Sequence, residues 1–331
     1  MITLEHDSLV FRFPDVHADA EFTVSLIRTL RIPDDGRDHP LPPGLGHFAL
    51  RHIDDCARHL PDHMTERGGV IVPMYQAEAM WLNFQPAWGF AYPFALKIGA
   101  GKINAVTGAG WTNTLSGDPQ DYVVIPGQPW LDGYCVEKGV IRQFVAAPFD
   151  RGVTVEEQLT GESGWGGVQL LAFPMKLEQA LELRTAWERK RRHLVLHEAP
   201  AFHEFPLRAD LGLAAGGRMR QAIAIDPYGI DAWDQEQSSR CFVTILESHA
   251  WTAITGEAMP SKPIDAAHYT KAGLPWFDYQ TDQPAVSGSK VLAGIKSIAQ
   301  AWKSPPAPFE ASVPPPRVES LGFRQVKEMR G

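Results

Sequence analysis

The stretch VIRQFVAAPFDRGVTVEEQLTGESGWGGVQLLAF, residues 140–173, decides the fold prediction. It contains three short runs rich in apolar and β-branched residues, at 140–147, 153–160 and 168–173, with glycine-rich breaks between them. Short strands joined by tight turns are typical of antiparallel sheets. We therefore predict three consecutive strands that form an antiparallel meander.

The rest of the chain has the same punctuation, because 29 glycines and 27 prolines interrupt its 331 residues. Residues 93–105 predict a hairpin that turns at a Gly-Lys pair. Alternating or β-branched runs predict further strands at residues 8–13, 21–32, 47–53, 69–73, 80–84, 121–126, 218–225 and 240–246. Residues 193–216 are interpreted as irregular.

Helices are expected to be few. Residues 177–192 have apolar side chains at helical spacing, acidic residues early and basic residues late, which predicts one amphipathic helix. Short helices are predicted at 248–254 and 265–272, and a broken helical turn or two near Pro61. The fold class is therefore α+β, mainly β: an antiparallel sandwich or partly closed barrel with a few short helices.

We predict one β-rich domain over residues 1–303, since no change in composition divides it. Residues 304–316 hold six prolines, so 304–331 are interpreted as a proline-rich strap followed by a charged C-terminal tail.

Composition limits the classes of partner. The formal net charge of −8 argues against binding to nucleic acid or to anionic membranes. No apolar run reaches about 18 residues, so no membrane span is predicted. The three cysteines form no disulfide framework, and the N-terminus has no secretory pattern, so a cytoplasmic location is expected.

Catalytic and phosphate-binding motifs are incomplete. Gly99–Lys102 lacks the first glycine and the final Ser or Thr of a phosphate-binding loop. Gly161–Trp165 has tryptophan where a nucleophile elbow needs glycine, and Ser287–Lys290 has no accompanying serine/lysine elements. The sequence therefore predicts no cofactor and specifies no catalytic residue.

Two groups of thiol and imidazole side chains are candidate ligands or nucleophiles. Cys56, His59 and His63 would share one helix face, as metal ligation requires, but Pro61 interrupts that helix. Cys135 has no neighbouring base, so we interpret it as a buried, inert thiol. We predict no metal site.

Polar residues inside or just after apolar strands are the better signal. Such side chains face water, pair with one another or line a cavity. The candidate ligand-lining residues are Arg142, Gln143, Glu156, Gln158, Arg218, Arg220, Gln221, Asp226 and Tyr228. Six of the ten tryptophans mostly stand beside glycine or proline in turns, where they either cover a β core or stack on sugars or partner proteins: Trp81, Trp88, Trp111, Trp130, Trp165 and Trp276.

Six segments carry a family resemblance. They are RTLRIPDDGR (28–37), QPWLDGYCVEKGVIRQFVAAP (128–148), TVEEQLTGE (154–162), GLAAGGRMRQ (212–221), DPYGIDAWD (226–234) and GLPWFDYQ (273–280). Together they resemble an uncharacterised protein family of bacteria, especially actinobacteria, and of some fungi. The resemblance covers most of residues 20–300 and implies one intact unit, but that family has no established activity, so no site residue follows from it.

Two functional hypotheses remain. The first is a non-enzymatic binding or self-assembling protein that uses an aromatic and polar face of a β scaffold, with a homo-oligomer, a protein partner, or a small-molecule or sugar ligand. The second is a hydrolase whose carboxylates, such as Glu156 and Asp226, act as acid and base. The second hypothesis requires Arg142, Glu156, Arg218 and Asp226 to converge in one cleft.

Overall fold

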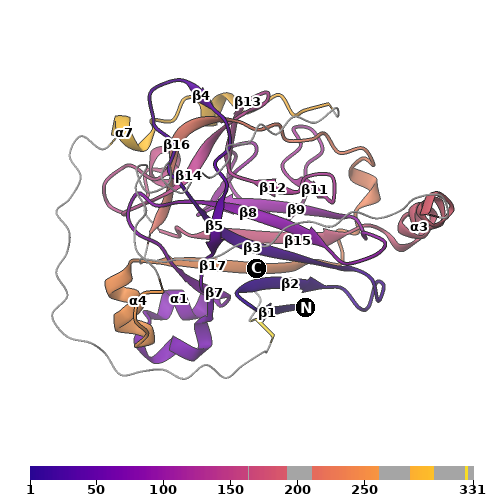
Figure 1. Ribbon diagram of the computed structural model, residues 1–331, viewed down its shortest axis with the longest axis horizontal. Helices are drawn as coiled ribbons and strands as arrows, with labels where there is room; N and C mark the ends of the chain where they lie inside the picture. The colour runs from indigo at the N-terminus through magenta and orange to yellow at the C-terminus, as the bar shows by residue number, and fades with distance from the viewer. Residues whose placement is uncertain (163, 192–210, 261–283, 302–324, 327–331) are drawn as a thin grey trace.

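Two β-sheets share one hydrophobic core in the computed structural model (Figure 1). It describes residues 1–162, 164–191, 211–260, 284–301 and 325–326. Where the sheets meet, the ring of Phe22 lies 4.6 Å from that of Phe94 on the other sheet, and 4.9 Å from Phe11 on its neighbouring strand. Aromatic pairs of this kind bury a large apolar area, so they hold the two layers together.

The larger sheet is antiparallel except at one edge, where β4 runs parallel to β16. Its strand order is β1 (Ile2–Glu5), β2 (Ser8–Arg12), β3 (Glu21–Thr29), β8 (Ala79–Pro86), β14 (Val140–Ala147), β16 (Gly212–Arg220) and β4 (Asp38–His39). Three short strands pair beside this path: β5 (Gly44–His47), β12 (Trp130–Leu131) and β13 (Gly133–Glu137).

The smaller sheet follows the order β10 (Ile103–Asn104), β9 (Phe94–Ala100), β15 (Val168–Pro174), β17 (Ser239–Leu246), β7 (Val70–Pro73) and β6 (Arg51–His52). A seventh strand, β11 (Val123–Ile125), pairs with β9. Different strands end each sheet, so the sheets are open and the arrangement is a sandwich. The predicted mainly β, α+β class is confirmed.

The described helices are η1 (Ile53–His59), α1 (Asp62–Arg67), α2 (Val155–Thr160), α3 (Leu177–Arg191), η2 (Ile230–Ala232), α4 (Ser248–Thr255), α6 (Lys290–Ala293) and α7 (Ile298–Ala301). Figure 1 shows α1, α3, α4 and α7 at the margins of the sheets. In the described part of the chain, none is long and apolar enough to cross a membrane.

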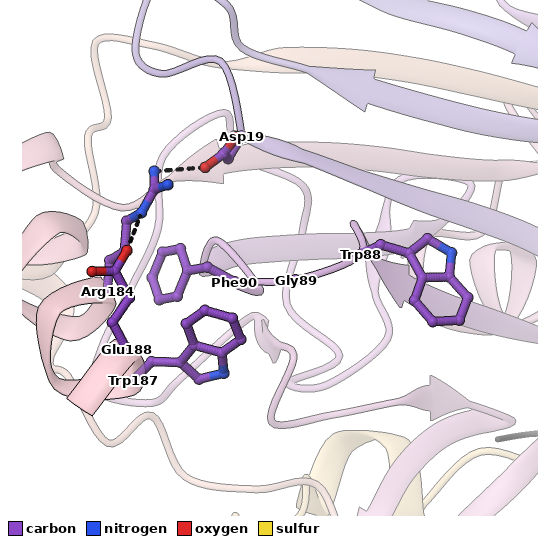
Figure 2. A pocket seen from close by; sticks show the side chains of 7 residues that line it. All are labelled: Asp19, Trp88, Gly89, Phe90, Arg184, Trp187 and Glu188. Carbon is purple, nitrogen blue, oxygen red and sulfur yellow. Dashed lines mark hydrogen bonds and ion pairs between the residues drawn. The ribbon is translucent and has the colours of Figure 1, made fainter. Parts of the chain in front are cut away.

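The long helix α3 confirms the prediction at 177–192 and projects from one end of the sandwich (Figure 1). Its Ala180 is buried, whereas Leu177 and Leu181 are 40% and 43% exposed. The predicted apolar face is therefore only partly covered. Arg184 ties the helix to the loop before β3, since its Nη1 donates to Asp19 Oδ2 at 2.7 Å (Figure 2).

The predicted meander is wrong, because residues 153–160 form the helix α2 rather than a strand. Thr154 and Glu157 build a reciprocal capping box: Glu157 N donates to Thr154 Oγ1 at 3.2 Å, and Thr154 N donates to Glu157 Oε2 at 3.0 Å. This local bonding overrides the β preference of the flanking valines. The strands on either side, β14 and β15, consequently belong to different sheets.

The strand predicted at 218–225 is also displaced, since β16 begins at Gly212 and ends at Arg220. Glycine allows close approach here: a Cβ on Gly216 would lie 2.5 Å from Val145 Cγ2, and one on Gly217 would lie 2.4 Å from Pro33 O. The segment lacks the side chains that mark a strand in a sequence, so it was interpreted as irregular. The predicted strand 47–53 is instead divided between β5 and β6, in different sheets.

The remaining strand predictions are confirmed at their centres, with shifted ends at several, and the hairpin at 93–105 forms from β9 and β10. The predicted helix at 248–254 is α4. The predicted helix at 265–272 and most of the predicted strap and tail lie outside the described residues. Of the tail, Gln325 bridges to Thr3, and Val326 is buried and donates its N–H to Ile2 O at 2.6 Å.

Candidate functional site

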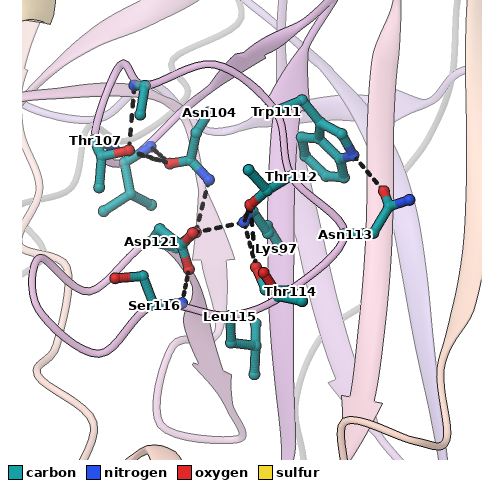
Figure 3. Close-up of polar contacts among 12 residues, drawn as sticks. Lys97, Asn104, Thr107, Trp111, Thr112, Asn113, Thr114, Leu115, Ser116 and Asp121 are labelled. Atoms are coloured by element: carbon teal, nitrogen blue, oxygen red, sulfur yellow. Dashed lines mark hydrogen bonds and ion pairs between the residues drawn. The ribbon is translucent and has the colours of Figure 1, made fainter.

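A buried lysine organises one end of the smaller sheet (Figure 3). Lys97 on β9 is 1% exposed, and its Nζ donates to Asp121 Oδ2 at 2.6 Å, Thr112 Oγ1 at 2.8 Å and the Thr114 carbonyl at 2.6 Å. These three acceptors satisfy all three ammonium hydrogens. The charge is paired and fully hydrogen-bonded, as a buried charge must be. Lys97 therefore fixes the loop that contains Thr112 and Thr114.

Asp121 and Asn104 complete this support. The second oxygen of Asp121, Oδ1, accepts the N–H of Ser116 at 2.9 Å, and its carbonyl accepts Asn104 Nδ2 at 2.7 Å. Asn104 Oδ1 in turn accepts the N–H groups of Val106 and Thr107, both at 2.9 Å. Both ends of the loop are thus fastened to the β9–β10 hairpin.

The fastened loop presents Trp111 and Asn113 (Figure 3). Trp111 Nε1 donates to Asn113 Oδ1 at 3.0 Å, and the same oxygen accepts Arg240 Nη1 at 2.9 Å. The guanidinium carbon of Arg240 lies 5.3 Å from the centre of the Trp111 ring, and Lys97 Nζ lies 5.6 Å from it. Two cations therefore lie near one indole ring, within the range of cation–π attraction.

Arg240 and Trp111 line a pocket of about 400 Å³ beside the β9–β10 hairpin. That volume suits a small organic ligand. The residues around it are Lys102, Gly110, Trp111, Thr160, Trp165, Gln169 and Arg240. They come from a hairpin turn, a loop, α2, the α2–β15 connection and the adjacent strands β15 and β17.

Arg240 is a buried cation with neutral partners. It is 9% exposed, and its Nη2 donates to Gln169 Oε1. Its Nε is buried without a hydrogen-bond partner, and no ion pair joins it to a carboxylate in the described ranges. Burial lowers the pKa of Arg240, but arginine keeps its charge in proteins. The pocket wall thus carries a positive charge that no described carboxylate neutralises.

Trp165 also lines the pocket, from the connection between α2 and β15. Arg67 from α1 holds it there: Nη1 and Nη2 donate to the carbonyls of Trp165 and Gly164 at 2.8 and 2.6 Å, and the guanidinium lies 4.7 Å from the Trp165 ring centre. Lys102 Nζ lies 5.8 Å from that ring and 3.6 Å from Glu162. Lys102 therefore has an acidic partner, unlike Arg240.

Glu156, a predicted ligand-lining residue, does not line this pocket. The side chain is buried, and its oxygens accept the backbone N–H groups of Lys102 at 3.1 Å and Gly166 at 2.8 Å. Lys102 lines the pocket, and Gly166 directly follows the lining residue Trp165. Glu156 thus joins the hairpin turn to the Trp165 wall, and its carboxylate is engaged by the protein's own backbone.

Arg142 and Arg218 lie opposite each other on β14 and β16, away from the Trp111–Arg240 pocket. Arg218 binds Glu137 at 2.8 Å and Asp38 at 2.7 Å, and Arg142 Nη1 donates to the Ile295 carbonyl at 3.1 Å. Arg218 is therefore held by two carboxylates, and Arg142 by a carbonyl.

The predicted glutamines serve as internal ties. Gln143 donates to the Leu30 carbonyl and accepts the Ile32 N–H, both at 2.9 Å, and it is fully buried. Gln158 belongs to α2 and exchanges hydrogen bonds of 3.0 and 2.7 Å with the backbone of Lys296. Gln221 is buried, and its Nε2 donates to Asp132 Oδ2 at 2.8 Å.

Asp226 belongs to a third network. One of its oxygens, Oδ2, accepts Tyr122 Oη at 2.6 Å and Trp233 Nε1 at 2.8 Å. Tyr228 is 39% exposed, and its ring lies 5.8 Å from that of Trp233; Arg220 is exposed at the end of β16. The predicted set is therefore divided among several structural networks, and the described contacts do not join Arg142, Glu156, Arg218 and Asp226 in one pocket.

Sequence interpretation missed Lys97 and Arg240, although each is a cation within an apolar strand. That is the same signal that selected Arg142. The segments FALKIGA and RCFVTIL predict strands, but the residues that bind their cations, Lys97 and Arg240, lie far away in the chain. The tryptophans differ in role: Trp111 and Trp165 line the pocket, Trp81 and Trp130 pack edge to face at 6.2 Å, and Trp276 lies outside the described residues.

The thiols are buried and unreactive in character. Burial raises the pKa of Cys135 to about 12 and that of Cys56 to about 11, which leaves both protonated near neutrality. His59 Nδ1 is bonded to the Ile254 carbonyl at 3.1 Å, while His63 is exposed on α1. Among the residues that the structure describes, no cluster of three metal-binding side chains occurs.

The incomplete motifs have structural roles. Gly99–Lys102 forms the β9–β10 turn, as predicted. Ser289 caps α6: its Oγ accepts the Leu292 N–H at 3.3 Å and donates to the Thr107 carbonyl at 2.5 Å. The 161–165 segment follows a helix and precedes a strand, which corrects the expectation of strands on both sides and reverses the order that a nucleophile elbow needs.

Comparison with protein-family models, curated proteins and solved structures finds no match for this chain. Membership in the uncharacterised bacterial and fungal family therefore stays a prediction.

Proposed function

We propose that this chain is a binding protein for a small organic anion, held in the Trp111–Trp165–Arg240 pocket. The observation that carries the proposal is the buried guanidinium of Arg240, whose described partners are neutral. Burying a charge without a countercharge is costly. An anionic group in the pocket would supply that countercharge and form charge-assisted hydrogen bonds with the guanidinium.

The two indole rings suggest the rest of the ligand. Trp111 and Trp165 give the pocket flat apolar walls, and its volume of about 400 Å³ admits a ring-sized body beside the anionic group. Aromatic rings favour stacked or edge-on partners at contact distance. We infer a carboxylate or phosphate attached to a planar ring as the preferred chemistry, with a sugar acid as a second form.

The hydrolase alternative has less support. Its two carboxylates, Glu156 and Asp226, bind different parts of the protein, and each already accepts hydrogen bonds from internal donors. A general acid or base must reach the proton that it transfers. The hypothesis stays a prediction, which the release of product from chromogenic ester and glycoside substrates would test.

Titration calorimetry with benzoate, benzamide, phenyl phosphate and glucuronate tests the binding proposal. Benzoate and benzamide have similar shapes, but only benzoate carries charge, so we expect saturable binding of the anions and little of benzamide. Arg240→Gln removes the charge-assisted bonds and should weaken binding by about 10- to 100-fold. A protein that binds no anion in this set, or binds benzamide as tightly as benzoate, would contradict the proposal.

Arg142→Gln is the matched control. It removes one arginine that is likewise partly buried, and burial likewise lowers the pKa of that side chain, but it does not line the pocket. Anion affinity should be unchanged in this variant. An equal loss in both variants would indicate a general effect of charge instead of a site at Arg240.

Light scattering during size exclusion tests the separate prediction of a homo-oligomer.

A further inference from the structure

A second pocket, of about 660 Å³, lies between α3 and the loop that follows β8 (Figure 2). It shares no residue with the Trp111–Trp165–Arg240 pocket. Its lining combines three aromatic rings with a small charged group. The residues are Asp19, Trp88, Gly89, Phe90, Arg184, Trp187 and Glu188.

Two of the aromatic rings form a corner. The rings of Phe90 and Trp187 have centres 6.1 Å apart and planes inclined by 62°. Phe90 also packs edge-on against Tyr92, at 6.4 Å, and Tyr92 is anchored by a 2.8 Å bond from its hydroxyl to the Met175 carbonyl. The buried ring of Tyr92 therefore supports the Phe90 side of the corner.

The third ring, Trp88, is fully exposed, at 101% of its reference area. Figure 2 shows it farther along the same loop as Phe90, beyond Gly89. An indole with no covering atoms offers its whole face to a ligand. The backbone at Gly89 has φ +99°, a conformation that favours glycine, so the loop's shape depends on this residue.

The charged group of the lining is negative overall. The guanidinium of Arg184 binds Asp19 through Nη1 at 2.7 Å and Glu188 through Nε at 3.2 Å. One cation faces two carboxylates, which leaves a single negative charge beside the aromatic corner. The electron-rich faces of aromatic rings and a nearby negative charge both attract cations.

We propose that this pocket binds a quaternary ammonium group. Arg184 already donates hydrogen bonds to both carboxylates, Asp19 and Glu188. A second cation would therefore gain little from having N–H donors of its own. A methylated ammonium needs no hydrogen bonds, because it is stabilised by ring faces and by net charge. The ligand class is therefore small choline-like molecules, rather than the lysine or arginine side chain of a partner.

Choline and its uncharged isostere 3,3-dimethyl-1-butanol provide the direct test, in which the full-length protein is titrated and its tryptophan indole N–H resonances are followed by NMR. The Trp88→Phe and Trp187→Phe variants assign the two pocket signals. We expect choline to shift these signals with an affinity at least about tenfold higher than that of the alcohol. Similar affinities for the two compounds would overturn the proposal, as would signals that do not move.

Two glutamates on the same helix give a matched pair. Glu188→Gln removes the net negative charge of the pocket and should weaken choline binding several-fold, whereas the exposed Glu178, outside the lining, should tolerate the same change without effect. An equal change in choline affinity in both variants would refute the role of the pocket's negative charge. Tighter binding of Nα-acetyl-lysine N-methylamide, whose side chain carries a primary ammonium, would refute the preference for methylated cations.

Discussion

Asp132 is a carboxylic acid whose burial raises its pKa to about 7, from an ordinary value of 3.8. It lies between β12 and β13, where Gln221 Nε2 donates to Oδ2 at 2.8 Å and Gln221 Oε1 accepts the Asp132 N–H at 3.0 Å. Asparagine has the same shape and retains an oxygen for the Gln221 donor. Asp132→Asn therefore removes the charge while keeping the contact.

The sign of the effect follows from proton binding. Between about pH 4 and pH 7 the folded state holds a proton on Asp132 that the unfolded state releases, so the stability of the natural protein falls as pH rises through this window. A shift of about 3 units corresponds to about 4 kcal/mol above pH 7. About two-thirds of the window lies above pH 5, so the advantage of Asp132→Asn should grow by about 3 kcal/mol between pH 5 and pH 8.

Urea unfolding of both proteins at pH 5 and pH 8 measures this difference. Glu78 is a second buried acid whose pKa is raised to about 7 by burial, but it is present in both proteins and cancels in the comparison. Equal pH dependence of the two proteins would refute the reasoning. A variant less stable than the natural protein at pH 8 would show that the ionised Asp132 makes a favourable contact.

Three further variants, each measured by urea unfolding, test the contacts that hold the Trp111–Trp165–Arg240 pocket in place and the N-terminal cap of α2. Lys97→Met leaves the Asp121 carboxylate buried without its cation and should cost about 3–5 kcal/mol, while adding Asp121→Asn should recover part of the loss. Thr154→Ala removes the cap of α2 and should cost about 1 kcal/mol; no loss would contradict the capping box. Gly166→Ala should cost more than about 1 kcal/mol, because φ is +56° and its Cβ would lie 2.1 Å from the Phe149 ring; a neutral effect would refute the close contact.

The strands with large alternating side chains could be predicted from the sequence. The bounds of β14 are those predicted, and β2 and β15 differ from prediction by one residue at one end. In these segments local preference and burial favour the same structure, since β-branched and aromatic residues suit a pleated, buried surface.

Prediction failed where local and long-range effects compete. The TVEE segment contains a capping-box signal at Thr154 and Glu157, but its valines favour a strand, and the two local signals conflict. At 212–217 the sequence predicts mostly irregular structure where a strand forms. The small residues there permit close strand packing but show no strand-like alternation. Which strands pair also depends on contacts across the whole chain, so the separation of β14 and β15 into two sheets was not readable locally.

The candidate site was missed for the same reason. Arg240 and Gln169 lie on adjacent strands but 71 residues apart, and Asn113 is 127 residues from Arg240. A strand cation can be recognised in a sequence, but its partners cannot. The predicted polar residues were candidates for lining a ligand site, and several of them bind the protein's own backbone instead.

Lys97, Arg218 and Arg240 differ in the partners that the described chain offers to their charges. Lys97 has a carboxylate and two further oxygens as partners, so its charge is satisfied within the chain. Arg218 has two carboxylates. Arg240 has two amide oxygens and a buried, unpartnered Nε. A buried charge is tolerated where compensation is available, and under our proposal an anion in the adjoining pocket supplies it for Arg240.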